Sequence, residues 1–111
     1  MLVLQSGERA VIPLGFRATL PRGCEAQVRA RSGTVLKLGL VVANGPGTID
    51  ADYTGEWGVL VLNASSAPIS VAHGERVAQV VFARFEVLDF APGIVVQTTE
   101  RAGGFGSTGT R

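Results

Sequence analysis

Hydrophobic residues in this chain come in short runs that glycine, proline, asparagine and aspartate interrupt every several residues. Runs rich in Val, Leu and Ile with such breaks are typical of strands joined by turns in a β-sandwich or barrel. The pattern predicts strands over residues 9–12, 16–20, 25–31, 40–42, 57–63, 69–71, 78–88 and 94–97. Helical periodicity is almost absent, so we expect an all-β domain.

The composition changes this picture in one respect. A chain of 111 residues predicts a single domain. Charged residues make up 17% of the chain and hydrophobic residues 46%. Glycine brings the apolar share to roughly 60%, against about 45–50% for an average domain. A small monomer has too little interior to bury so much apolar surface, so we expect an oligomer.

The net charge and the presence of only one cysteine and one histidine exclude several classes of function. The formal net charge of +1 predicts neither nucleic-acid binding nor attraction to an anionic membrane. Cys24 is the only cysteine and His73 the only histidine. They cannot form an internal disulfide or a structural zinc site, and a buried thiol is expected. With no apolar run of about 20 residues and no signal-peptide pattern, we expect a soluble, cytoplasmic protein.

The segment 47–56 carries the first candidate chemistry, because two acids and a tyrosine lie between glycines there. Apolar runs flank it on both sides, which predicts a tight hairpin with exposed backbone amides. Asp50 is a candidate general base, and Tyr53 is a candidate platform for a ring. Asp and Gly are also the common residues of turns, so an ordinary hairpin accounts for the segment equally well.

Two further segments combine polar groups at strand ends. Arg31, Ser32 and Gly33 offer a guanidinium fork, a hydroxyl and a flexible amide, which suit an anion. A solvated strand end is the simpler interpretation. Gln79 lies among apolar neighbours after a turn, where it either serves a site or only braces the turn.

The last segment, residues 98–111, is glycine-rich, and Phe105 is its only large apolar residue. It cannot bury enough surface to order itself. We expect a β domain over residues 1–97 and a flexible arm over 98–111. The arm is either a frayed terminus or a lid that orders over a ligand. It lacks the lysine of a Walker-type loop.

These segments, in this order, resemble the trimeric dUTPase family (deoxyuridine triphosphate nucleotidohydrolases). The resemblance covers nearly the whole chain and rests on residues 12–15, 31–33, 44–56, 74–79 and 101–109. It implies a dUTPase-like β-barrel or jelly-roll domain with a C-terminal arm that closes over the site. The family's Ala-Gly-x-Asp-Leu motif is not found before Ile12, so the resemblance implies a fold that lacks the family's first strand.

The resemblance also implies a reaction, hydrolysis of dUTP to dUMP and pyrophosphate, and a role for each residue. Asp50 activates the attacking water, and Gln79 helps to organise the phosphates. A homotrimer with shared active sites and Mg²⁺ held through substrate phosphates and water are implied as well, with no protein ligand to the metal. The implied substrate-binding residues are Arg31, Ser32, Gly33, Asn44, Gly47, Ile49, Tyr53, Arg101, Phe105, Gly106, Ser107 and Thr108.

Two alternatives share this fold. One is a nucleotide-binding or interaction module without catalysis, for which the absent first motif is an argument. The other is dCTP deaminase, which resembles this chain at Asn63 but has a glutamate where Leu60 lies. Arg101 also lies one residue closer to the glycine pair than is usual in the dUTPase family.

Overall fold

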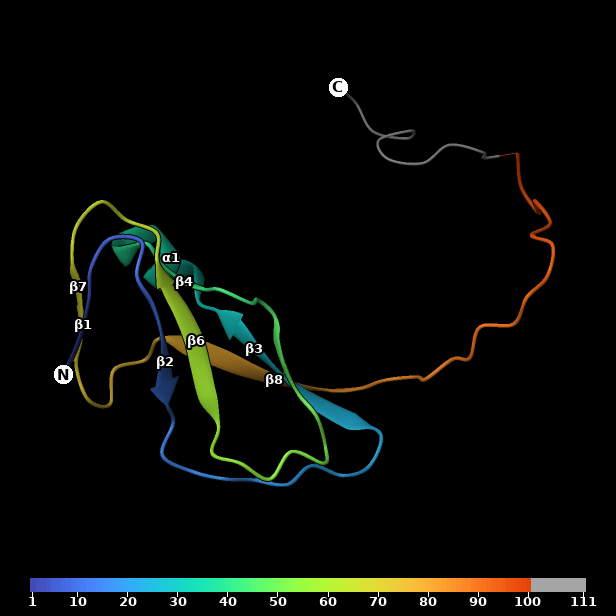
Figure 1. The fold of residues 1–111 in the computed structure, drawn as a ribbon, viewed down its shortest axis with the longest axis horizontal. Coiled ribbons are helices and arrows are strands. Elements are labelled where there is room, and N and C mark those ends of the chain that lie inside the picture. Colours follow the sequence, from blue (N-terminus) through green and yellow to red (C-terminus); the bar gives the residue numbers. More distant parts are fainter. Residues whose placement is uncertain (101–111) are drawn as a thin grey trace.

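The computed structural model describes residues 1–100 of the chain. Eight strands and one short helix make up this part, which confirms the expected all-β class (Figure 1). In chain order they are β1 (Leu2–Leu4), β2 (Arg9–Pro13), β3 (Cys24–Ala30), α1 (Ser32–Leu38), β4 (Leu40–Val42), β5 (Gly47–Ile49), β6 (Gly58–Asn63), β7 (Ile69–Val71) and β8 (Ala78–Arg84). No helix in this part is long and apolar enough to span a membrane.

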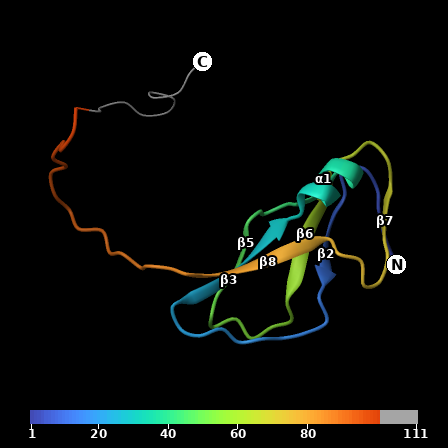
Figure 2. The same ribbon diagram turned by 180° about the vertical axis from the view of Figure 1, so that it is seen from behind.

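The strands form three small antiparallel sheets, in the orders β1-β7, β2-β6-β4 and β5-β3-β8. Figures 1 and 2, which are opposite views, show β8 crossing β6, with its partner β3 alongside. The longest pairing joins β3 to β8 over seven residues, from Cys24 opposite Arg84 to Ala30 opposite Ala78. This pair is therefore the rigid support on which segments near its two ends are held.

The core lies between these sheets and takes residues from all three. Its members are mostly valine and leucine at alternate strand positions, as the period of two in a strand requires. They are Leu4, Val28, Leu40, Val42, Val59, Val61, Ile69, Val71 and Val77. Full burial of each such side chain stabilises the folded state by roughly 1.5–3 kcal/mol relative to leaving it exposed.

Asn63 is the one buried polar side chain among the described residues. Its amide nitrogen donates to the carbonyls of Leu4 and Ala67, at 2.9 and 2.8 Å. Its amide oxygen accepts from the backbone N–H and the hydroxyl of Ser65. All its polar groups are thus paired, as burial demands, and the residue ties β1 to the turn between β6 and β7.

Several predicted elements differ from the observed ones. Residues 16–20 and 94–97 are not strands, and β8 ends at Arg84 rather than at residue 88. Short strands that the pattern did not predict are β1 and β5, which have three residues each. A three-residue strand depends on its partner for its hydrogen bonds, so its own sequence gives little signal.

Helix α1 was also not predicted, because residues 31–33 were interpreted as the end of a strand. The helix has no buried residue and no side-chain cap at Arg31. It ends at Gly39, which has a φ of 73° and donates its N–H to the carbonyl of Val35. A Cβ at Gly39 would lie 2.9 Å from the Cβ of Ser65. Glycine is therefore needed there for both the left-handed conformation and the close approach.

Residues beyond Phe85 leave the packed body as an extended chain (Figure 1). The radius of gyration is 19.0 Å, whereas a compact chain of this length has about 13 Å. Large apolar side chains stay exposed along this extension: Val87, Leu88, Phe90, Ile94, Val95 and Val96. A single copy of the chain offers them no cover.

Candidate active site

The loop between β4 and β6, residues 43–57, holds five of the nine predicted site residues that the structure describes, and we call it the site loop. The flanking strands pair as expected, with Val42 opposite Val61. The loop itself is not the tight hairpin that was predicted. Its β5 segment pairs with β3 instead, with Gly47 opposite Val28 and Ile49 opposite Ala26. The loop is therefore opened widely, and a pocket can form inside it.

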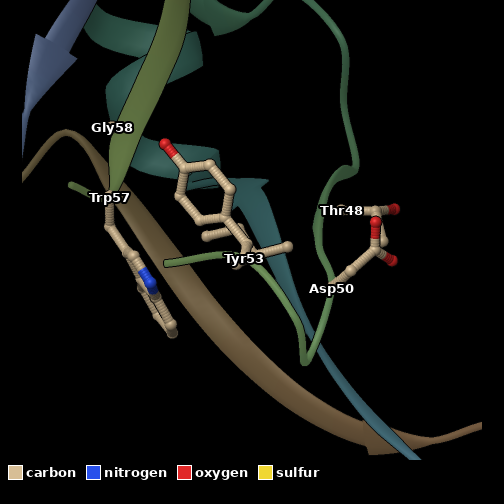
Figure 3. A pocket seen from close by; sticks show the side chains of 6 residues that line it. Thr48, Asp50, Tyr53, Trp57 and Gly58 are labelled. Carbon is tan, nitrogen blue, oxygen red and sulfur yellow. The ribbon is translucent and has the colours of Figure 1, made fainter. Parts of the chain in front are cut away.

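Two adjoining pockets lie in the site loop. The first has a volume of about 190 Å³ and is lined by Thr48, Ile49, Asp50, Tyr53, Trp57 and Gly58. Figure 3 shows Trp57 and Tyr53 lying opposite Thr48 and Asp50 around this pocket. The second has about 220 Å³, shares Thr48, Ile49, Tyr53 and Gly58 with the first, and adds Val11, Val28, Asn44, Gly47, Glu56 and Leu60. The structure thus brings the five predicted residues of the site loop together.

Asp50 stands at the rim of the first pocket with an exposed side chain. Its carboxylate makes no hydrogen bond or ion pair with any residue in the described part of the chain. Its backbone carbonyl accepts from the N–H of Tyr53 at 3.1 Å, which forms a turn. The backbone is held by this turn while both carboxylate oxygens remain available to a water or a ligand.

Tyr53 is held by its own hydroxyl, which donates to the carbonyl of Glu56 at 2.9 Å. A Cβ on Gly55 would lie 2.5 Å from that hydroxyl, so only glycine fits between them. The ring is 45% exposed and presents an apolar face to the pocket. Such a ring is suited to pack against a sugar or a base.

The site also contains three residues that were not predicted as site residues: Thr48, Glu56 and Trp57. The carboxylate of Glu56 accepts the N–H of Gly15 at 3.0 Å, which ties the loop after β2 to the site loop. Trp57 lies 2% exposed beside the first pocket. The sequence did contain a signal for Trp57, since it is the only tryptophan and directly follows the candidate segment.

The predicted phosphate-binding residues lie together in a second place. Arg31 precedes α1, and Ser32 and Gly33 form its first turn. The side-chain amide of Gln79 donates to the carbonyl of Ala30 at 2.9 Å, directly before Arg31. Gln79 is exposed, so its observed role is to brace this strand end. Its amide oxygen makes no hydrogen bond within residues 1–100.

These two places lie at opposite ends of β3. Ile49, just before Asp50, pairs with Ala26, and Arg31 follows Ala26 by five residues. Five residues of strand span about 17 Å. The backbones that carry Asp50 and Arg31 in one chain are therefore well separated along β3.

The remaining predicted residues, Arg101, Phe105, Gly106, Ser107 and Thr108, lie outside the described residues. Within residues 1–100, no three His, Cys, Asp or Glu side chains gather into a group that could hold a metal ion.

Comparison with known proteins identifies the family of this chain. The dUTPase family model matches residues 1–109. The fold is similar to that of the dUTPase from Streptococcus mutans, with 29% identity, a TM-score of 0.75 and 80% of this chain and 74% of that chain covered. It is also similar to the dUTPase of Staphylococcus bacteriophage 80alpha with dUPNHPP, with 25% identity, a TM-score of 0.86 and 98% and 80% covered.

The all-β fold is thus one that this chain shares with nucleotide-hydrolysing proteins. The chain belongs to the dUTPase family. It is a dUTP diphosphatase, which hydrolyses dUTP to dUMP and pyrophosphate.

Proposed function

We propose that Asp50 holds and activates the water that attacks the α-phosphorus of dUTP. The observation that carries this proposal is a free carboxylate at the rim of a pocket whose opposite wall is Tyr53. As the oxygen of the water bonds to phosphorus, the bond to the bridging oxygen of the β-phosphate breaks. Pyrophosphate leaves, and the proton of the water passes to Asp50. A positioned base of this kind contributes about 10²–10⁴-fold to a rate. The reaction supplies dUMP and limits uracil in DNA.

The base and sugar are selected by the site loop in this proposal. Tyr53 packs under the deoxyribose, where its fixed ring leaves no space for a 2′-hydroxyl. The backbone near Asn44, Gly47 and Ile49 lines the second pocket and pairs with the edge of uracil. Cytosine presents the wrong donor pattern there and would leave buried groups unpaired, which discriminates strongly.

The phosphates are held by Arg31, Ser32 and Gly33, with Gln79 keeping that strand end in place. These residues lie about 17 Å along β3 from the partner of Ile49. A dUTP molecule that meets Asp50 must therefore find its phosphate donors on another copy of the chain. We propose a homotrimer with shared active sites, in which the exposed apolar residues between 87 and 96 become covered.

The C-terminal arm completes the site in the same proposal. Arg101 clamps phosphates, Phe105 stacks on uracil, and Gly106, Ser107 and Thr108 cover the γ-phosphate. The boundary between the β domain and the arm at residue 97 stays a prediction. The packed strands end at Arg84, and residues 85–97 join the domain only once a neighbouring copy covers them.

Mg²⁺ enters this site with its substrate. Magnesium keeps several waters and commonly binds through substrate phosphates rather than an all-protein cage. The guanidinium of Arg31 carries only donors, so it can bind phosphate oxygens but not a hard cation, which fits this mode. When bound, Mg²⁺ neutralises charge on the triphosphate. In a variant of the phage phi11 dUTPase of S. aureus, 22% identical and similar in fold, a structural Mg(II) ion is coordinated.

Turnover of three nucleotides tests the proposal. The protein with Mg²⁺ and dUTP is expected to release dUMP and pyrophosphate in equal amounts, with far slower turnover of dTTP and dCTP. Tight dUTP binding without turnover would instead identify a nucleotide-binding module. Ammonia release from dCTP would indicate a deaminase, although Leu60 in the second pocket offers no acid for that reaction.

The lone thiol Cys24 and a nucleotide substrate support a cytoplasmic location.

A further inference from the structure

The indole nitrogen of Trp57 is the one buried side-chain polar atom without a hydrogen-bond partner among the described residues. Buried indole N–H groups usually have an acceptor. An unpaired one is costly, because its bond to water has been lost without replacement. A donor left in this state beside a pocket points to an acceptor that the ligand brings.

The ring of Trp57 cannot turn freely to find another acceptor. Its centroid lies 5.3 Å from that of Phe16 and 6.5 Å from that of Phe82, so aromatic rings hold it on two sides. Its backbone N–H donates to Phe16 at 3.0 Å, and its carbonyl accepts from Leu14 at 2.8 Å. In Figure 3 the nitrogen lies on the edge of the ring turned toward the Tyr53 side of the pocket.

The position of Trp57 indicates which part of the substrate supplies the hydrogen-bond acceptor. Trp57 lines the first pocket with Asp50 and Tyr53, which by the proposed function meet water and sugar. It does not line the second pocket, where Asn44 and Gly47 are expected to meet uracil. Because the indole nitrogen is turned toward Tyr53, the proposed platform for the sugar, rather than toward Asp50, we assign the acceptor to the sugar.

We propose that Trp57 is a substrate-binding residue whose indole N–H donates a hydrogen bond to the 3′-hydroxyl oxygen of the bound deoxyribose. This inference rests on the proposed function of the same site. The nitrogen is covered in the free chain and the ring is packed in place, so the site loop must shift slightly when nucleotide enters. The bond then relieves the unpaired donor and adds to affinity for deoxynucleotides that carry a 3′-hydroxyl.

Replacing Trp57 by phenylalanine tests this directly, because Phe keeps an aromatic ring between Phe16 and Phe82 but has no N–H. Calorimetric binding of dUpNHpp to the Trp57→Phe protein is expected to be about tenfold weaker than to the wild type. The melting temperature without ligand should stay the same or rise, since the variant has lost an unpaired donor. Equal affinity of the two proteins for dUpNHpp would overturn the proposal, whatever the melting temperature.

Phe16→Leu is the matched control, since it loosens the same aromatic stack and keeps the N–H. It is expected to lower the melting temperature while binding dUpNHpp within about twofold of wild type. A similar loss of affinity in both variants would mean that Trp57 acts only through packing. The emission of Trp57, the only tryptophan of the chain, should also change when dUpNHpp binds to the wild type.

The 2′,3′-dideoxy form of dUpNHpp assigns the acceptor. Wild type and Trp57→Phe should bind this analogue with equal affinity, because its 3′-hydroxyl is missing. A persistent difference would show that the acceptor is not this hydroxyl and would overturn the assignment. If wild-type protein neither binds dUpNHpp nor hydrolyses dUTP, the proposed function itself fails. If it does both and Trp57→Phe matches it, only the role of Trp57 fails.

Discussion

The hydroxyl of Tyr53 donates a 2.9 Å hydrogen bond to the carbonyl of Glu56. This bond fixes the Tyr53 ring, which faces the pocket, against the end of the site loop. The bond connects a side chain to a backbone group only three residues further on, so the ring is fixed by the loop itself. Glu56 in turn accepts the N–H of Gly15 through its carboxylate. The platform proposed for the sugar is thus anchored to the turn after β2.

Gly55→Ala should disturb this platform. The new Cβ would lie 2.5 Å from the hydroxyl of Tyr53, so the ring must move or lose its bond to Glu56. We expect kcat/KM for dUTP to fall by about 10²-fold, the cost of misplacing a reacting group by roughly 1 Å. An active Gly55→Ala enzyme would show that Tyr53 is not a fixed platform.

Asp50→Asn should remove the water-activating group and leave the pocket shape intact. We expect kcat to fall by about 10²–10⁴-fold while the affinity for dUpNHpp survives. Asp52→Asn is the control, because Asp52 is an exposed acid of the same loop that lines neither pocket. A normal rate in the Asp50→Asn enzyme would mean that another group activates the water.

Mixing two inactive variants should restore activity. Asp50 and Arg31 of one chain lie near opposite ends of β3, so each proposed site takes its Asp50 and its Arg31 from different chains. Asp50→Asn and Arg31→Ala proteins, unfolded and refolded together in equal amounts, should regain about a quarter of the wild-type sites. Each variant refolded alone should remain inactive. If the mixture is also inactive while mixed oligomers are found by mass, each site draws both residues from one chain.

The exposed apolar residues of the extension should be needed for assembly. Replacing both Ile94 and Val95 by aspartate places charges on side chains that are 94% and 96% exposed in a single copy. We expect the mass in solution to fall from that of a trimer to that of a monomer, with loss of dUTP turnover. A variant that stays trimeric would locate the interface elsewhere.

A chain that ends at Glu100 tests the C-terminal arm. We expect it to keep its melting temperature within about 2 °C, because a glycine-rich segment with one large apolar residue can bury little surface. Its kcat for dUTP should fall sharply, because the proposed clamp by Arg101 and stacking by Phe105 are lost. A large drop in melting temperature would instead make the arm a structural element.

Local sequence patterns predicted the elements whose burial alternates. The apolar and polar alternation along β3 and the long apolar run of β6 were visible in the chain, as was the polar segment between β4 and β6. Residues 16–20 and 94–97 are also rich in apolar side chains, yet no strand within residues 1–100 pairs with them. A strand needs a neighbour for its hydrogen bonds, and apolar composition alone cannot supply one.

The same limit applies to the site. Asp50 and Tyr53 could be singled out because they lie three residues apart in a glycine-bounded segment. The contact of Trp57 with Phe16 and Phe82 joins residues far apart in the chain, and no local signal encodes it. The brace from Gln79 to Ala30 spans 49 residues for the same reason.

The sequence by itself determined the all-β class, the segments that carry acid, aromatic and phosphate-binding groups, and through their order the family. The tertiary structure decided that β5 pairs with β3, which opens the site loop into two pockets and leaves Trp57 with an unpaired donor. It also decided that Asp50 and Arg31 lie apart. Side-chain chemistry is a local property of the chain, whereas distance depends on strand register, which long-range pairing sets.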